Sequence, residues 1–219
     1  MSLKIALAGG GGAEDSQCID EYFAQWNGMN GKMLYIPIAL RNSNRSFEDC
    51  YKWVYSTLAP VGISNIEMWT DLGDHKASEL DKFNSVYIGG GNTFSLLGEL
   101  IDSGFDQILR QYVTEGMPIY GGSAGAVILG KDIRTVEHID SNDIGLERSN
   151  CLDLAFDSSV WVHYQLSDDT LIQKYVNTTQ YSVLAISERS GVIIEGDSIQ
   201  SVGFESVYRF EIGKKQKLQ

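Results

Sequence analysis

Hydrophobic positions along the chain alternate between short apolar runs and segments with helical spacing. In residues 15–26, apolar side chains recur at steps of three and four residues, which is the pattern of a helix with one buried face. The runs between such segments are short and continuously apolar, as expected for strands of a parallel sheet that is covered on both faces. Before Gly145, we predict strands at 4–8, 33–38, 65–69, 85–88 and 117–120, and helices at 15–26, 46–58, 93–101 and 105–115.

The pattern changes beyond Gly145, where apolar runs follow one another closely. Strands are predicted at 160–164, 183–187, 191–195, 199–204 and 207–212, with one helix at 168–176 and a frayed tail at 214–219. We find no linker and no internal repeat, so we expect these strands to complete the same sheet within a single domain of residues 1–219. The predicted fold class is α/β, with a largely parallel central sheet between two layers of helices.

Composition argues against several classes of function. The 219 residues are 43% hydrophobic, which is enough for a sizeable core, and the net charge of -12 argues against nucleic acid as a partner. No apolar run approaches the length of a membrane span, and no secretory leader opens the chain. Three scattered cysteines (Cys18, Cys50 and Cys151) indicate neither a disulfide framework nor a zinc site, and they favour a reducing cytosol.

The segment Tyr120-Gly-Gly-Ser-Ala-Gly-Ala126 places Ser123 between a predicted strand and a stretch of small residues. This is the layout of a nucleophile elbow, in which a serine hydroxyl stands at the tip of a sharp strand-to-helix turn. Glycine neighbours suit such a strained turn because strand, helix and substrate approach closely there. The amide of Ala124 would then face a developing oxyanion. The alternative from these residues alone is a glycine-rich turn in which Ser123 is an ordinary helix N-cap.

Two glycine-rich loops follow other predicted strands. The segment Gly89-Gly-Gly-Asn-Thr93 opens a helix at the carboxyl edge of the sheet, where ligands bind in open α/β folds. A loop of N–H groups beside Ser123 would supply the other donor of an oxyanion hole, although a plain turn capped by Asn92 or Thr93 has the same pattern. The run Gly9-Gly-Gly-Gly12 lacks the third glycine of a dinucleotide fingerprint and the lysine of a P-loop, so we interpret it as a tight turn.

A serine nucleophile needs a general base, and the chain has three histidines. His75 and His138 lie in polar stretches, whereas His163 ends a predicted strand in an aromatic setting that would shelter a base from water. An ordinary surface or core position is the alternative for each of them. The acids that could orient a base are concentrated in one stretch, for which a solvated loop is the alternative: Glu137, Asp140, Asp143 and Glu147.

Together these segments resemble peptidase E, the aspartyl dipeptidase of the peptidase E and cyanophycinase group. The resemblance covers roughly residues 4–202 and rests on Ile88-Gly-Gly-Gly-Asn-Thr-Phe-Ser-Leu-Leu97, Tyr120-Gly-Gly-Ser-Ala-Gly-Ala126, Asp132-Ile-Arg-Thr135, and Leu152-Asp-Leu154 followed by His163. It implies a three-layer αβα sandwich like that of class I glutamine amidotransferases, with serine in place of their cysteine. It also implies that Ser123 is the nucleophile and His163 the base, with an oxyanion hole formed by Gly90 or Gly91 and Ala124.

Two departures from the peptidase E pattern modify these expectations. The family's acid follows the segment that matches Ile133-Arg-Thr135, and ungapped spacing places His138 there, directly after Glu137. Glutamate can do the same work, so we expect Glu137 to complete the triad, with Asp140 next and His138 itself last. The family also has an arginine after the catalytic histidine that holds the substrate's aspartate, but residues 165–172 are shorter, acidic and without arginine. Aspartyl peptides are therefore expected to be poor substrates.

The sequence thus predicts a cytosolic serine peptidase that hydrolyses small peptides, such as dipeptides, through an acyl-enzyme and without a metal or organic cofactor. One alternative is a hydrolase of another amide or ester bond on the same machinery. A second is a catalytically silent binding protein that lacks a competent acid. No membrane or nucleic-acid partner is expected, and a homodimer is compatible with the sequence, which does not determine the oligomeric state.

Overall fold

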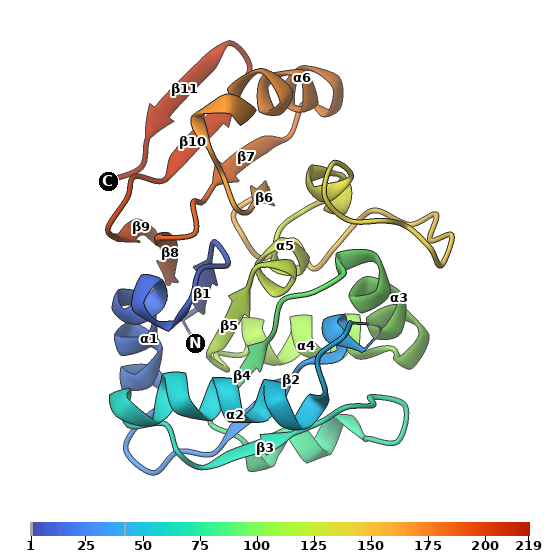
Figure 1. The fold of residues 1–219 in the computed structure, drawn as a ribbon, viewed down its shortest axis with the longest axis vertical. Helices are drawn as coiled ribbons and strands as arrows, with labels where there is room; N and C mark the ends of the chain where they lie inside the picture. Colours follow the sequence, from blue (N-terminus) through green and yellow to red (C-terminus); the bar gives the residue numbers. More distant parts are fainter. Residues whose placement is uncertain (1, 42) are drawn as a thin grey trace.

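A seven-stranded sheet lies at the centre of the computed structural model, which describes residues 2–41 and 43–219 (Figure 1). Its strand order is β3-β2-β4-β5-β1-β8-β9, and the strands are β1 Lys4–Ala8, β2 Met33–Ile36, β3 Ile66–Met68, β4 Ser85–Ile88, β5 Ile119–Gly122, β8 Ser190–Glu195 and β9 Ser198–Gly203. The first five strands in this order pair in parallel, whereas β8 and β9 are antiparallel to their neighbours. The prediction of a largely parallel central sheet is confirmed.

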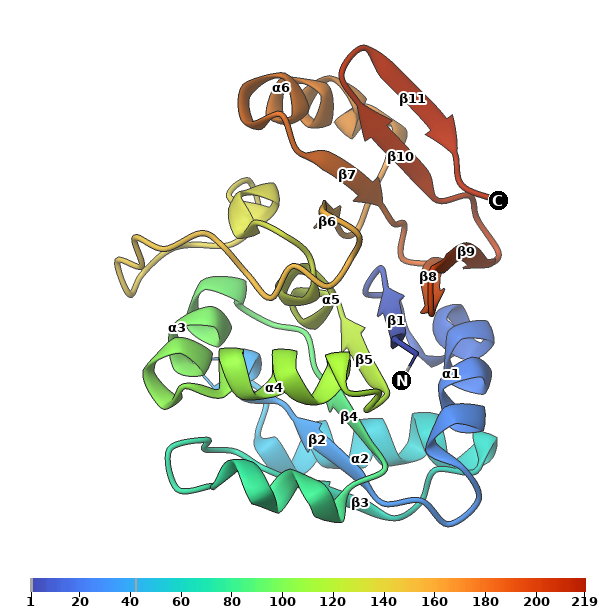
Figure 2. The ribbon, with the colours of Figure 1, turned by 180° about the vertical axis from the view of Figure 1, so that it is seen from behind.

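Helices cover both faces of this sheet, as Figures 1 and 2 show from opposite sides. One layer contains α1 Ala13–Asn27 and α2 Phe47–Leu58, and the other contains α3 Thr93–Ser103, α4 Phe105–Thr114 and α5 Ala124–Leu129. The strands alternate their side chains between the two layers. In β2, Met33 and Tyr35 pack in the cluster with α1 and α2, whereas Leu34 and Ile36 pack in the opposite cluster. The continuously apolar runs of the sequence arise because both faces of each strand are buried.

Two helices begin at residues whose side chains cap them. The Ser46 hydroxyl accepts a hydrogen bond from the Asp49 amide at 3.1 Å at the start of α2, and the Asn92 side chain accepts one from the Ser95 amide at 2.9 Å at the start of α3. Short 3-10 helices occur at Ile38–Leu40, Ala59–Val61, Ala77–Lys82, Ile133–Val136 and Leu166–Asp168. Within residues 2–41 and 43–219, no helix is long and apolar enough to cross a bilayer.

A second sheet, of order β11-β10-β7-β6, packs with α6 at the top of Figure 1. Its elements are β6 Ser158–Trp161, α6 Asp169–Thr179, β7 Ser182–Ala185, β10 Tyr208–Glu211 and β11 Lys214–Lys217. The expectation that all later strands complete the central sheet is wrong for β6, β7 and β10, because an apolar run predicts a strand but not its partner. The frayed tail is also wrong: a turn with Gly213 at φ +65° returns the chain, so that 214–217 pairs with β10 as a lysine-rich edge strand.

Candidate active site

Ser123 stands at the turn between β5 and α5, at the carboxyl edge of the central sheet. Its backbone has φ +49° and ψ −112°, a strained conformation for a residue with a side chain, and its amide donates to the Ala8 carbonyl at 3.1 Å. The glycines on either side permit this turn. A Cβ at Gly121 would lie 2.5 Å from the Gly125 carbonyl carbon, and one at Gly125 would lie 2.3 Å from the Ile88 carbonyl oxygen. The sequence therefore folds into a strand–serine–helix turn that only small residues allow.

His163 follows β6 and brings its imidazole to the Ser123 hydroxyl, with Nε2 and Oγ 2.9 Å apart. The backbone of His163 has φ +53°, and its amide donates to the Gly9 carbonyl at 3.0 Å. The ring lies directly against Gly10, where a Cβ would be 2.3 Å from the imidazole Cε1. The loop at Gly9–12 is thus more than the tight turn inferred from the sequence, because it positions the imidazole of His163. The sequence does not reveal this role, since it does not show which segment packs on the loop.

Glu188 makes the contact with His163 that the sequence analysis expected of Glu137. Its carboxylate oxygen Oε1 lies 2.9 Å from Nδ1 of His163. The expectation for Glu137 is corrected by this geometry, since Glu137 lies exposed after Ile133–Val136 and lines a different cavity with His138. Glu188 reaches His163 because β1 and β8 pair antiparallel, with Ala8 opposite Gly191, so the turn before β8 meets the loop after β1.

The other sequence candidates for the acid have structural roles. The Asp140 carboxylate accepts the amide N–H of Thr93 at 2.8 Å, at the start of α3. His138 stacks on Trp161, with ring centroids 4.3 Å apart, and lies on the surface. His75 likewise stacks on Trp69, at 3.7 Å between ring centroids. Among the described residues, neither of these imidazoles has a hydrogen bond to a serine hydroxyl.

The loop at Gly89–91 lies beside the serine. A Cβ at Gly90 would be 3.1 Å from Cβ of Ser123 and 3.6 Å from its Oγ, so only glycine leaves the hydroxyl approachable from this side. Gly91 has φ +135° and packs on the Ala39 carbonyl. Within the part of the chain that the structure describes, the amides of Gly90, Gly91 and Ala124 have no hydrogen-bond acceptor. Free N–H groups of this kind are what an oxyanion hole requires.

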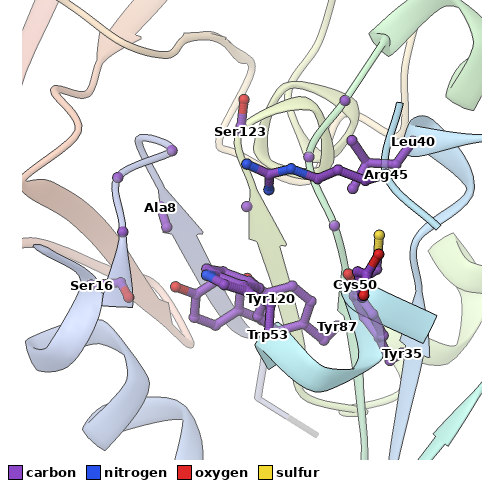
Figure 3. A pocket seen from close by; sticks show the side chains of 18 residues that line it. Ala8, Ser16, Tyr35, Leu40, Arg45, Cys50, Trp53, Tyr87, Tyr120 and Ser123 are labelled. Carbon is purple, nitrogen blue, oxygen red and sulfur yellow. The ribbon is translucent and has the colours of Figure 1, made fainter. Parts of the chain in front are cut away.

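A cavity of about 360 Å³ opens next to Ser123 (Figure 3). The glycine loops at 10–12 and 89–91 line it near the serine, and its floor is formed by Tyr35, Tyr87 and Tyr120. Burial raises the pKa of Tyr87 and Tyr120 far above the ordinary tyrosine range, so the floor carries neutral hydroxyls. Behind Tyr120, burial raises the pKa of Asp20 to about 6, against the lowering effect of hydrogen bonds from Ser16 and Tyr120.

Arg45 is the one basic side chain among the residues that line this cavity. Three other arginines that could have reached the site are held elsewhere by carboxylates: Arg41 by Glu99, Arg134 by Asp132 and Arg148 by Asp106. For Arg45, no ion-pair partner occurs among residues 2–41 and 43–219. Neither acid that follows His163 lines the cavity: Asp169 pairs with Lys215 at 2.6 Å, and Asp168 accepts a hydrogen bond from the Gln165 amide at 2.9 Å. In the same described residues, no group of three or more His, Cys, Asp or Glu side chains is arranged to hold a metal ion.

Comparisons with known proteins identify the family and the fold. The model of peptidase family S51 matches residues 5–202. Peptidase E of Haemophilus influenzae is 29% identical over 117 residues, 53% of this chain and 51% of that protein, so the match spans about half of that relative. Peptidase E of Actinobacillus pleuropneumoniae is 24% identical over 203 residues, 87% of this chain and 82% of its own. The crystal structure of a "putative peptidase E protein" from Listeria monocytogenes superimposes with a TM-score of 0.75 at 24% identity, covering 94% of this chain and 100% of that one.

Proposed function

Because the chain belongs to peptidase family S51 and is a serine-type peptidase, we propose that Ser123, His163 and Glu188 act as its catalytic triad on small peptides. The observation that carries this proposal is the continuous chain of contacts from the Ser123 hydroxyl through both ring nitrogens of His163 to the Glu188 carboxylate, at 2.9 Å each. Each distance is within the range over which such groups exchange or share protons.

The geometry supports a mechanism through an acyl-enzyme. Nε2 of His163 accepts the Ser123 proton as Oγ attacks the substrate carbonyl, and Glu188 holds the Nδ1–H tautomer that keeps Nε2 free to accept. The tetrahedral oxyanion receives N–H donors from Gly90 or Gly91 and from Ala124. His163 then returns the proton to the leaving amine, and the same base activates a water that hydrolyses the ester to Ser123.

Aspartyl specificity is not part of this proposal. The segment after His163 contributes no arginine, and the one arginine of the cavity, Arg45, shares it with the carboxylate of Asp49. A substrate carboxylate would therefore meet both a positive and a negative group in the same space. We therefore expect aspartyl peptides to be poor substrates. If they are good substrates instead, Arg45 is the residue that would bind their carboxylate, and its substitution should abolish the preference.

Labelling with a fluorophosphonate tests the proposal without knowledge of the substrate. The protein should be labelled at Ser123, identified by mass spectrometry of the modified peptide, and should hydrolyse dipeptides with loss of both properties in Ser123→Ala. The matched control is Ser95→Ala, which removes a half-buried hydroxyl of α3 that does not line the cavity and should leave labelling intact. Absence of labelling in a folded wild-type protein would identify a silent binding protein, and labelling elsewhere would overturn the assignment of Ser123.

A further inference from the structure

The cavity beside Ser123 spans the central sheet, from Ala8 and Gly10–12 on the side of His163 to Tyr35 on β2. His163 and Glu188 lie on the side of β1 and β8, against Gly10 and the turn before β8. In the strand order, β5, β4 and β2 lie successively farther from β8. The floor of the cavity follows this direction, with Tyr120 on β5, Tyr87 on β4 and Tyr35 on β2.

The three tyrosines form a continuous row because the parallel strands place them in register. Tyr35 is opposite Tyr87, and Tyr87 is opposite Tyr120. The rings of Tyr87 and Tyr120 stack with centroids 4.4 Å apart, and those of Tyr35 and Tyr87 meet edge-to-face at 5.5 Å. Glycines keep the cavity open above this row. A Cβ at Gly89, directly after β4, would lie 3.2 Å from the Tyr35 hydroxyl, and a Cβ at Gly122, the last residue of β5, would lie 3.1 Å from the Tyr87 hydroxyl.

The reaction geometry decides which part of a substrate enters this space, an argument that rests on the proposed function. The leaving nitrogen must lie near Nε2 of His163, on the β1 side, and the carbonyl oxygen must face Gly90, Gly91 and Ala124. The remaining substituent of the attacked carbonyl is the α-carbon with its side chain. The α-carbon is therefore directed away from the leaving nitrogen, toward the part of the cavity over the tyrosine row.

We infer that the cavity is the specificity pocket for the side chain of the residue whose carbonyl is attacked, and that it prefers a large aromatic side chain. Three buried tyrosines form its floor, and Trp53 of α2, which is 37% exposed, supplies the accessible aromatic ring of its lining. Aromatic side chains pack favourably on such surfaces in edge-to-face or offset arrangements. Arg45 at the mouth can stack its guanidinium on an inserted ring, whereas Asp49 and the buried Asp20 behind Tyr120 disfavour an inserted carboxylate.

A substrate series tests this inference directly. The dipeptides Phe-Leu, Leu-Leu, Ala-Leu and Asp-Leu differ only in the side chain that the pocket would receive, so their kcat/KM values report its preference. We expect Phe-Leu to exceed Ala-Leu by about tenfold or more, as for other apolar pockets, and Asp-Leu to be the poorest. Equal values for Phe-Leu and Ala-Leu, or a preference for Asp-Leu, would overturn the inference while leaving the triad intact.

A binding readout separates this inference from the triad itself. Boronic-acid analogues of phenylalanine and alanine form an adduct with an active serine, so each should protect Ser123 from fluorophosphonate labelling. The phenylalanine analogue should protect at about tenfold lower concentration, and equal protection would refute the aromatic pocket even if no dipeptide is turned over. Failure of the fluorophosphonate to label the protein would refute the proposed function and this inference with it.

Trp53 provides a variant that tests the pocket wall. Trp53→Ala should lower the ratio of kcat/KM for Phe-Leu over Ala-Leu by about tenfold, because an aromatic contact is lost. Tyr55→Ala is the matched control, since Tyr55 lies on the same helix with 42% exposure against 37% for Trp53 but does not line the cavity. An unchanged ratio in Trp53→Ala, or an equal fall in Tyr55→Ala, would contradict the assigned pocket.

Discussion

The surroundings of His163 and His138 contain similar residue types but are built differently. Both imidazoles lie near a glutamate and a cavity. His163 is fixed between a hydroxyl and a carboxylate by contacts from three separate loops at the carboxyl edge of the central sheet. His138 rests with its ring flat on Trp161, and its neighbour Glu137 belongs to the same short turn.

The difference shows that chain proximity of a histidine and an acid does not make a proton relay. Adjacent residues such as Glu137 and His138 share one backbone segment, which does not bring their side chains to a common serine. Ser123 follows a parallel strand of the central sheet, His163 follows β6 of the second sheet, and Glu188 precedes the antiparallel strand β8. These distant segments meet at one edge of the central sheet, where their side chains converge.

Removal of the two imidazoles should have effects of very different size. His163→Gln should lower kcat on the best dipeptide by about 10⁶-fold, because the nucleophile loses its base. His138→Gln should leave kcat within about twofold, since that ring makes no contact with Ser123. Both are measured by steady-state hydrolysis with circular dichroism as a check on folding. A large loss of kcat in His138→Gln would reverse the contrast.

Two glycines of the loop after β1, Gly10 and Gly12, allow a controlled test of how the imidazole of His163 is positioned. Gly10→Ala would place a Cβ 2.3 Å from Cε1 of His163, at a residue with φ +107°, and should lower kcat by about a hundredfold through displacement of the ring. At Gly12, a Cβ would meet nothing nearer than an Asp15 carboxylate oxygen at 3.7 Å, so Gly12→Ala should have little effect on kcat. Equal kcat values in the two variants would show that Gly10 does not position the base.

Asp20 is buried, whereas the acid Glu188 is half-exposed, so we expect the ionisation of Asp20 to change the free energy of unfolding with pH. Its folded pKa of about 6 lies above the ordinary value of 3.8, so the folded state retains a proton that the unfolded chain releases. Its contribution is fully present below pH 4 and is lost as pH rises through 6, by up to about 3 kcal/mol. Relative to wild type, Asp20→Asn should therefore gain unfolding free energy between pH 4 and pH 7.5 in urea titrations. A pH-independent difference would mean that Asp20 ionises freely in the folded protein.

Sequence reasoning reached the parts of the site that are encoded locally. The strand–glycine–serine turn at Ser123 and the loop at Gly89–91 each have a signature within a few residues, and the structure brings both together with His163. Glu188 was missed because Ser187-Glu-Arg-Ser190 has the composition of an ordinary turn between two strands. Its position beside His163 depends on the antiparallel pairing of β1 with β8, a contact between segments about 180 residues apart that no local pattern specifies. The same limit explains the second sheet, whose strands were predicted but whose partners were not.

The most direct test of the triad is the comparison of kcat for Glu188→Gln and Glu137→Gln on the same dipeptide. Glu188→Gln should reduce kcat on the order of a thousandfold with KM nearly unchanged. This loss is smaller than that for a buried triad acid because the Glu188 side chain is 59% exposed. Glu137→Gln should retain kcat within about twofold. Near wild-type kcat in Glu188→Gln, or a comparable loss in Glu137→Gln, would contradict the assignment of Glu188 as the residue that orients His163.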